Sequence, residues 1–252
     1  MNITRVLAPN PGPFTGTGTN SYLISSGREA VVIDPGPMVD AHLAAIRAAI
    51  EDLTLVAVLV THHHLDHSPA ANPLATEYGV PSLGYGSYGG FQAIAQVADG
   101  DVVRVGTEVI EVLNTPGHTP DSLCFSVSDG VFTGDTIKAG TTVVVEDMSA
   151  YMATLQRLAD LAPTRLFPGH GEVIEDGPDT IAGYIAHRRQ REEQVLSALD
   201  GGAHTLDNVI EAVYPGLDPA LLALATQSAV AHIRKLVDDG LVGSTEAGWS
   251  LR

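Results

Sequence analysis

The sequence contains a single cysteine, few basic residues and no long apolar run. One cysteine, Cys124, can form neither an intrachain disulfide nor a thiolate metal cage, so any metal must be bound by His, Asp and Glu. Thirteen Lys and Arg against thirty Asp and Glu leave a formal net charge of -17, which argues against duplex DNA as a partner. The longest apolar stretches, such as 53–60, are far shorter than the roughly 18 residues of a membrane span. The first residues also lack the regions of a signal peptide, so we expect a cytoplasmic protein with no membrane partner.

What remains is the composition of an ordered globular chain. With 44% hydrophobic and 17% charged residues, a sizeable core can form. Up to about residue 166, short β-branched runs alternate with Ala- and Leu-rich helical stretches, and Gly and Pro separate them. Buried strands are predicted at 30–33 and 53–60, and a helix at 41–52 with Asp40 as its N-cap.

Two pairs of alternating runs predict β-hairpins beside these helix-connected strands. The runs in 102–113 are joined at Gly106-Thr107, and those in 123–133 are joined at Asp129-Gly130. Antiparallel pairs next to helix-connected strands favour sandwiched sheets with outer helices over a purely parallel sheet. The predicted fold class is therefore α+β.

The composition changes after a long charged helix predicted at 179–199, which Gly201-Gly202 ends. Helical segments and then a β-ribbon over 241–252 follow, the arrangement of a small winged-helix-like domain. We place the domains at 1–185 and 186–252. Residues 183–252 hold six Lys and Arg against nine Asp and Glu, which favours packing or substrate framing over DNA contact for this domain.

The densest basic cluster of the chain is formed by Arg188, Arg189 and Arg191 in the charged helix. It could attract single-stranded RNA despite the overall acidity. The alternative is a solvated helix face on which the arginines pair with Glu192 and Glu193.

The strongest functional signal is the run HHHLDH at residues 62–67, directly after the predicted strand 53–60. In an extended loop alternate side chains share a side, so His62 and His64 can converge on one ion while His63 points away. Asp66 and His67 can then face a second ion. Imidazole nitrogens with carboxylates suit Zn²⁺, and also Fe²⁺ or Mn²⁺.

Three further candidates, His118, Asp135 and His170, each follow another predicted strand after or beside a glycine turn. Strand ends gather along one edge of a sheet, where sites on α/β frameworks tend to lie. The sequence therefore predicts that these side chains join the 62–67 run. Three histidines outside such settings are expected to be structural or surface residues: His42, His204 and His232.

These motifs together resemble those of the metallo-β-lactamase superfamily: HHHLDH, PGHT, FTGD and PGHG, with Asp34 in VVIDPG, in the usual order. The resemblance implies an αββα sandwich with a dinuclear metal site at the sheet edges. It also implies roles for individual residues: a first metal on His62, His64 and His118, a second on Asp66, His67 and His170, and Asp135 bridging. By the same resemblance Asp34, Asp66 and Asp135 are the catalytic carboxylates, with Asp34 orienting the ligand loop by hydrogen bonds.

A finer resemblance covers nearly the whole chain, including GTGTNSYLI, GHTPDS, YIAHRRQREEQVL and the winged tail. These segments are similar to the β-lactamase-like subgroup typified by a mitochondrial single-strand-specific endoribonuclease. Two divalent ions can lower the pKa of a bridging water to about 7 and so supply hydroxide. Hydrolysis of antibiotics is disfavoured, because many true metallo-β-lactamases have a cysteine ligand where this sequence has Asp135.

The predicted function is therefore that of a metal-dependent hydrolase, with phosphodiester cleavage in single-stranded RNA as the leading substrate hypothesis. One alternative is hydrolysis of a small thioester or lactone, as in glyoxalase-II-like chemistry, for which an acidic surface is no handicap. Another is a winged-helix regulator in which the metal site is only structural. The sequence does not predict an oligomeric state.

Overall fold

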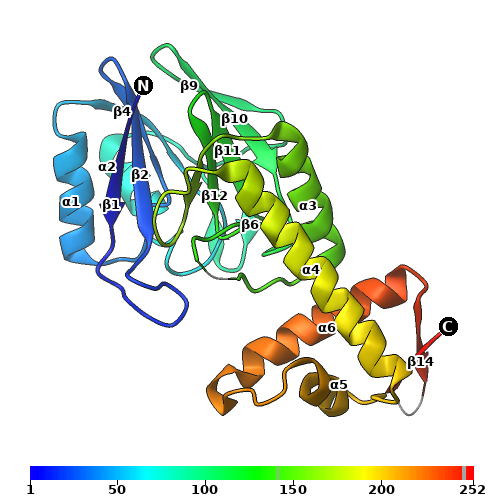
Figure 1. The fold of residues 1–252 in the computed structure, drawn as a ribbon. Helices are drawn as coiled ribbons and strands as arrows, with labels where there is room; N and C mark the ends of the chain where they lie inside the picture. The colour runs from blue at the N-terminus through cyan, green and yellow to red at the C-terminus, as the bar shows by residue number, and fades with distance from the viewer. Residues whose placement is uncertain (141, 246–247) are drawn as a thin grey trace. The chain divides into compact units, whose positions relative to one another are not determined.

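The computed structural model describes residues 1–140, 142–245 and 248–252, and Figure 1 shows its ribbon. Residue 141, and residues 246 and 247 of the predicted β-ribbon, lie outside these ranges. The described chain divides into two compact units. The first comprises residues 1–116, 121–143 and 162–178, and the second comprises the remaining described residues.

The first unit contains two large sheets. The strands of the six-stranded sheet are, in spatial order, β1 (Asn2–Leu7), β2 (Asn20–Ser26), β3 (Glu29–Ile33), β4 (Thr54–Leu59), β5 (Ser82–Gly84) and β8 (Ala95–Gln96). Those of the five-stranded sheet are β13 (Leu166–Pro168), β12 (Gly130–Gly134), β11 (Leu123–Val127), β10 (Glu108–Asn114) and β9 (Val102–Val105). A separate short hairpin is formed by β6 (Ser87–Tyr88) and β7 (Phe91–Gln92).

Both predicted hairpins are present, as the antiparallel pairs β9–β10 and β11–β12. The strands β3, β4 and β5 are parallel neighbours, and β12 is parallel to β13. Because parallel strands end at the same edge of their sheet, the segments after β3 and β4 emerge together, as do those after β12 and β13.

The two sheets pack face to face over a core to which both contribute, with Ile33 and Leu59 from one sheet and Val112 and Phe132 from the other. The helices α1 (Asp40–Ile50) and α2 (Ala71–Tyr78) lie on the outer face of the six-stranded sheet (Figure 1). Their apolar sides bury a second cluster against that face. The first unit is thus a helix–sheet–sheet sandwich.

The predicted N-cap of the first helix is wrong by one residue. Val39, with φ -114° and ψ 118°, occupies the N-cap position, and its carbonyl accepts from the Leu43 amide at 3.0 Å. Asp40 is instead the first helical residue. Its carboxylate still lies in the first turn, where the helix dipole stabilises negative charge.

The second unit contains α3 (Met148–Leu161), α4 (Gly177–Asp200, from Asp179 onward), α5 (Leu206–Val213), a 3₁₀ turn at Pro219–Leu221, α6 (Leu222–Asp238) and the antiparallel pair β14 (Val242–Thr245) and β15 (Gly248–Leu251). Val195, Val209, Ile233 and Val242 are among the residues of its apolar core. Helices followed by a two-stranded ribbon are the predicted winged-helix order.

In the described part of the chain, no helix is both long enough and apolar enough to cross a bilayer.

The arginines of α4 do not form one exposed face. Arg188 is only 2% exposed, and its guanidinium lies 5.3 Å from the centroid of the Tyr151 ring on α3. Arg191 lies 4.3 Å from the Tyr214 ring and donates to the Val213 carbonyl oxygen. Arg189 remains exposed. The predicted solvated face is therefore wrong for Arg188, because a guanidinium that stacks on an aromatic ring can be buried.

Candidate metal centre

Asp34 holds the loop that carries the HHHLDH run. It follows β3, its φ of 47° is in the left-handed region, and its carboxylate is buried. Asp34 Oδ1 accepts from the Thr61 amide at 2.7 Å, and Oδ2 accepts from the Thr61 hydroxyl at 2.6 Å. Asp34 Oδ2 also lies 2.8 Å from His67 Nδ1. One carboxylate thus fixes both the start and the end of the 62–67 loop.

Four donor atoms face one another at the end of this loop. His170 Nε2 lies 3.1 Å from Asp66 Oδ2 and 3.2 Å from Asp135 Oδ1. His67 Nε2 lies 3.3 Å from Asp66 Oδ2, 3.3 Å from His170 Nε2 and 3.5 Å from Asp135 Oδ1. His67, His170 and Asp135 are buried, whereas the Asp66 side chain is 26% exposed.

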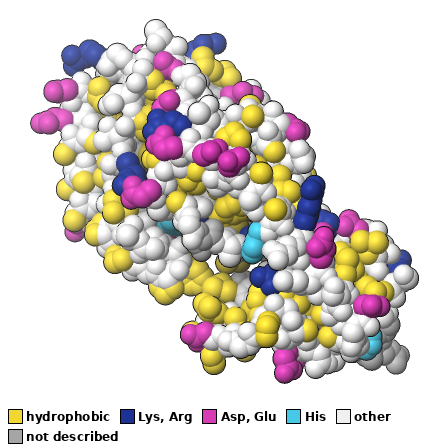
Figure 2. Space-filling view, in the orientation of Figure 1, with side chains coloured by type: hydrophobic (Ala, Val, Ile, Leu, Met, Phe, Trp, Pro, Cys, Tyr) yellow, Lys and Arg dark blue, Asp and Glu magenta, His cyan; other side chains and the backbone are white. Residues whose placement is uncertain are grey.

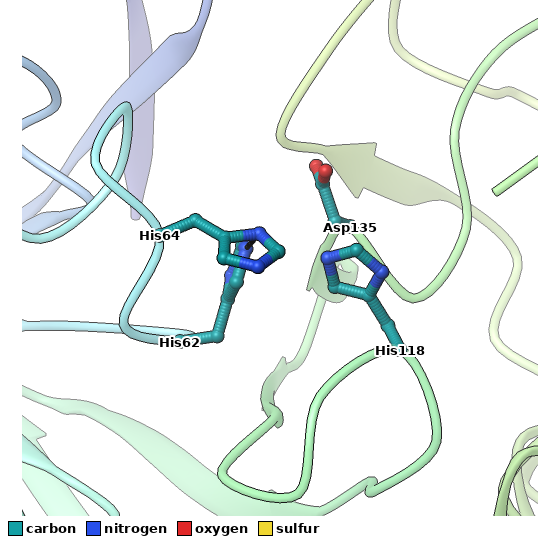
Figure 3. A group of neighbouring side chains, drawn as sticks. All are labelled: His62, His64, His118 and Asp135. Atoms are coloured by element: carbon teal, nitrogen blue, oxygen red, sulfur yellow. Dashed lines mark hydrogen bonds between the residues drawn. The ribbon is translucent and has the colours of Figure 1, made fainter. Parts of the chain in front are cut away.

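The predicted ligands form two groups, in each of which all ligand atoms lie within 4.8 Å of one another. One group consists of Asp66, His67 and His170, and the other of His62, His64, His118 and Asp135 (Figure 3). Within the latter, His62 Nε2 lies 3.0 Å from His64 Nδ1. His63 belongs to neither group, and its Nδ1 lies 2.8 Å from Asp121 Oδ1. All seven side chains predicted as ligands are therefore members of these two groups.

The outer nitrogens of these histidines have acceptors of their own. His67 Nδ1 faces the Asp34 carboxylate, and His170 Nδ1 lies 3.2 Å from the Gly18 carbonyl oxygen. His118 Nδ1 lies 2.7 Å from the Val144 carbonyl oxygen, and His62 Nδ1 lies 3.0 Å from the Thr61 hydroxyl. An imidazole that donates from Nδ1 presents the lone pair of Nε2, which is the state that binds a metal. The donor set therefore fits divalent cations.

The charges of the site are arranged to hold positive charge. Burial alone would raise the pKa of Asp135, but hydrogen bonds from His170 and His67 and the charges of His67 and Lys138 hold it well below its usual value. Burial would likewise raise the pKa of Asp66, yet the charge of His67 and hydrogen bonds from His170 and His67 lower it. Burial opposes protonation of His67, but Asp34 and Asp66 raise the pKa of its ring. Both carboxylates are thus ionised at neutral pH.

Sequence reasoning missed the side chains of Thr61, Thr19 and Lys138, which contact these groups. Thr61 links Asp34 to His62, and Thr19 donates from its hydroxyl to Asp66 Oδ2 at 3.2 Å. Lys138 places its ammonium 2.8 Å from Asp135 Oδ2. Thr19 lies in GTGTNSYLI and Thr61 directly precedes the 62–67 run, but neither position indicated a contact with a carboxylate of the site. Lys138 did offer a signal, because the chain contains only two lysines and this one lies three residues after Asp135.

Two family models match the sequence of this chain. A sequence model of the metallo-beta-lactamase superfamily matches residues 14–170, and one of the beta-lactamase associated winged helix domain matches residues 205–249. The Beta-lactamase-like protein 2 homolog of Caenorhabditis elegans is 32% identical over 252 residues, which cover 95% of this chain and 85% of that protein.

An atrochrysone carboxyl ACP thioesterase of Aspergillus chevalieri is 37% identical over 227 residues, which cover 84% of this chain and 73% of that protein. The crystal structure of a beta-lactamase domain protein from Burkholderia ambifaria superposes with a TM-score of 0.86 at 20% identity, over 99% of this chain and 91% of that one. That likeness shows the fold, and the sequence matches extend over both predicted domains. The chain belongs to the metallo-beta-lactamase superfamily of hydrolases and carries the winged-helix domain associated with it.

Proposed function

We propose that this hydrolase cleaves thioesters at a centre of two divalent cations. The observation that carries the proposal is the convergence of His67 Nε2, His170 Nε2, Asp66 Oδ2 and Asp135 Oδ1 within 3.5 Å of their neighbours. Buried carboxylates and inward-facing imidazoles are costly to assemble unless a cation compensates them.

In this proposal each group of side chains holds one cation. The first cation would be held by His62, His64 and His118, and the second by Asp66, His67 and His170. Asp135 would serve both, because it belongs to the first group and its Oδ1 also faces His67 and His170. We propose Zn²⁺, although the same donors accept Fe²⁺ and Mn²⁺. When bound, the cations supply Lewis acidity for the thioester carbonyl and lower the pKa of a water molecule to about 7.

The chain's own residues orient the reactants. Asp66 is ionised and partly exposed, so it accepts a hydrogen bond from the attacking water, while Thr19 fixes its Oδ2. Asp34 keeps the His67 ring in one orientation. The water oxygen adds to the carbonyl carbon, the carbon–sulfur bond breaks, and a carboxylic acid and a thiol are released. Since a thiol has a pKa of about 8.5, the thiolate departs without a dedicated general acid.

A thioester fits the surface better than a polyanion. On the face drawn in Figure 2, Lys and Arg side chains are scattered among acidic ones rather than gathered into a patch. Arg5, Arg47 and Arg165 are each paired with a glutamate. Arg188 is buried, which removes one member of the cluster on which RNA binding depended. Several relatives are named as acyl-carrier-protein thioesterases.

The experiment compares substrate classes on one preparation. Protein loaded with Zn²⁺ is incubated with an S-acyl-N-acetylcysteamine, a lactone, single-stranded RNA and bis(p-nitrophenyl) phosphate. We expect fast thioester hydrolysis that a chelator abolishes and added Zn²⁺ restores. Cleavage of the RNA without thioester turnover would overturn the thioester assignment and favour the phosphodiesterase of the sequence prediction. If the protein hydrolysed the lactone faster than the thioester, its substrates would be assigned to the class of oxygen esters instead.

A further inference from the structure

Lys138 is a buried cation beside the proposed metal centre. The residue is 8% exposed, and its Nζ lies 2.8 Å from Asp135 Oδ2. The same ammonium donates to the Phe14 carbonyl oxygen at 3.2 Å. A buried lysine loses its hydration, so this position is maintained by the acceptors around it.

The two oxygens of Asp135 have different surroundings. Oδ1 faces His67 Nε2 at 3.5 Å and His170 Nε2 at 3.2 Å, whereas Oδ2 faces the Lys138 ammonium. A carboxylate between two cations can use one oxygen or both. The contact with Lys138 engages Oδ2, while Oδ1 is directed at His67 Nε2 and His170 Nε2.

The segment 14–19 is fastened to the same donor atoms at three points. Lys138 donates to the Phe14 carbonyl, Gly18 O accepts from His170 Nδ1, and the Thr19 hydroxyl donates to Asp66. The latter two contacts involve residues that we propose as ligands themselves. Lys138 adds the third tie, and it connects this segment to Asp135.

We propose that Lys138 is a positioning residue of the metal centre, which holds Asp135 so that its Oδ1 faces His67 and His170 and which couples the segment around Phe14 to that carboxylate. The inference rests on the proposed function in one respect, namely that Asp135 binds metal. A purely electrostatic role makes the opposite prediction. A positive charge near the cations repels them, so its removal would then tighten metal binding.

Metal affinity distinguishes the two roles. Lys138→Met keeps most of the length of the side chain but removes the ammonium group, with its donors and its charge, and Lys138→Arg keeps the charge and a donor. We expect Lys138→Met to weaken Zn²⁺ binding about tenfold or more in competition with a chromophoric chelator, the range typical of residues that orient a ligand. Lys138→Arg should recover most of that loss. Equal or tighter binding by Lys138→Met would overturn the proposal.

The matched control is Lys235→Met, because Lys235 is the other lysine of the chain and also bridges two carboxylates, those of Glu192 and Asp239. Its removal should leave Zn²⁺ affinity unchanged. Circular dichroism and thermal unfolding of each variant check that the fold is retained.

A spectroscopic readout tests the contact itself. Protein labelled with [6-¹³C]lysine gives two lysine resonances, which Lys235→Met assigns. We expect Zn²⁺ to shift the Lys138 signal and leave the Lys235 signal in place, and Asp135→Asn to move the Lys138 signal even without metal. An unmoved Lys138 signal in Asp135→Asn would overturn the contact. If the parent chain still bound Zn²⁺ normally, the proposed metal centre would stand although the Lys138 contact had been disproved. Failure of the Lys138 proposal and failure of the metal centre are therefore distinguishable.

Discussion

Buried imidazoles occur in both units of the chain, but their surroundings differ. His67 is fully buried and lies close to three carboxylates, those of Asp34, Asp66 and Asp135. His232 on α6 is equally buried, yet neither ring nitrogen has a hydrogen-bond partner among the described residues, and Glu192 Oε1 is 3.9 Å away. Burial disfavours the charged form of both rings.

The pKa values of the two rings are shifted in opposite directions. Despite burial, the carboxylates raise the pKa of His67. Burial lowers the pKa of His232, and the charges of Arg188 and Arg191 add to that effect against a partial opposition from Glu192. Histidine alone therefore does not make a cation site. Carboxylates beside the imidazole are what favour positive charge at such a position.

The largest effect is expected when a carboxylate of the centre is neutralised. Asp135→Asn removes the charge between the two groups of donors and should lower kcat/KM for a thioester by at least about a hundredfold. Metal content by mass spectrometry should fall in parallel. Asp129→Asn is the control, because Asp129 is an exposed member of an ion pair with Arg165. If Asp135→Asn kept activity within a fewfold of the parent, catalysis would not require the Asp135 carboxylate.

A smaller effect is expected from the carboxylate that only orients a ligand. Asn tolerates the left-handed φ of residue 34, so Asp34→Asn can keep the turn. Its amide group, however, cannot accept from both the Thr61 hydroxyl and His67 Nδ1 at the Oδ2 position. We expect Zn²⁺ affinity to fall by about 10- to 100-fold, measured by chelator competition. An unchanged affinity would show that His67 needs no such support.

The convergence of the donor side chains could be predicted from the sequence, because each follows a strand and parallel strands end at one edge. The HHHLDH run follows β4, Asp135 follows β12, and His170 follows β13. The roles of these residues as ligands stay a prediction, as does the domain boundary at residue 186. Sandwiched sheets and the winged tail also followed from hairpin signals and the order of elements.

Side-chain placements set by distant residues could not be predicted. Arg188 is buried because a tyrosine from α3, far away in the sequence, stacks on its guanidinium. Lys138 folds back on Asp135 and reaches Phe14, which is 124 residues away. The capping position at Val39 depends on one residue's dihedral angles. Periodicity and composition carry no information about such contacts.

A third prediction concerns the imidazole that lacks carboxylate support. The folded-state pKa of His232 is lowered, so protonation is easier in the unfolded chain and stability is lost as pH falls below the unfolded value of about 6.5. His232→Leu should reduce the fall in unfolding free energy between pH 7.5 and pH 5, by about 1.4 kcal/mol for each unit of pKa difference between the states. Thermal unfolding at both pH values measures it.

The control for this comparison is His204→Leu, since His204 is exposed and its Nδ1 contacts the Trp249 carbonyl oxygen. It removes an imidazole from the surface rather than from the interior, and both variants are unfolded at the same two pH values. If His232→Leu lost as much stability on acidification as the parent, the neutral state of the buried ring would not contribute to the acid sensitivity of the protein.

The smallest effect is expected from the exposed arginine of α4. Arg189→Ala removes a side chain that lies in solvent, so the free energy of unfolding should change by less than about 0.5 kcal/mol. Arg188→Ala removes a buried guanidinium from the Tyr151 ring and should lower the free energy of unfolding several times more. Chemical denaturation measures both.

The same two variants examine the RNA hypothesis, because a nucleic-acid surface needs cations that solvent can reach. Arg189→Ala should leave thioester turnover unchanged, together with any retention of single-stranded RNA at low salt. A clear loss of RNA retention in this variant alone would mean that an exposed basic residue on α4 contacts phosphate. Phosphodiester cleavage would then again be the leading hypothesis for the function.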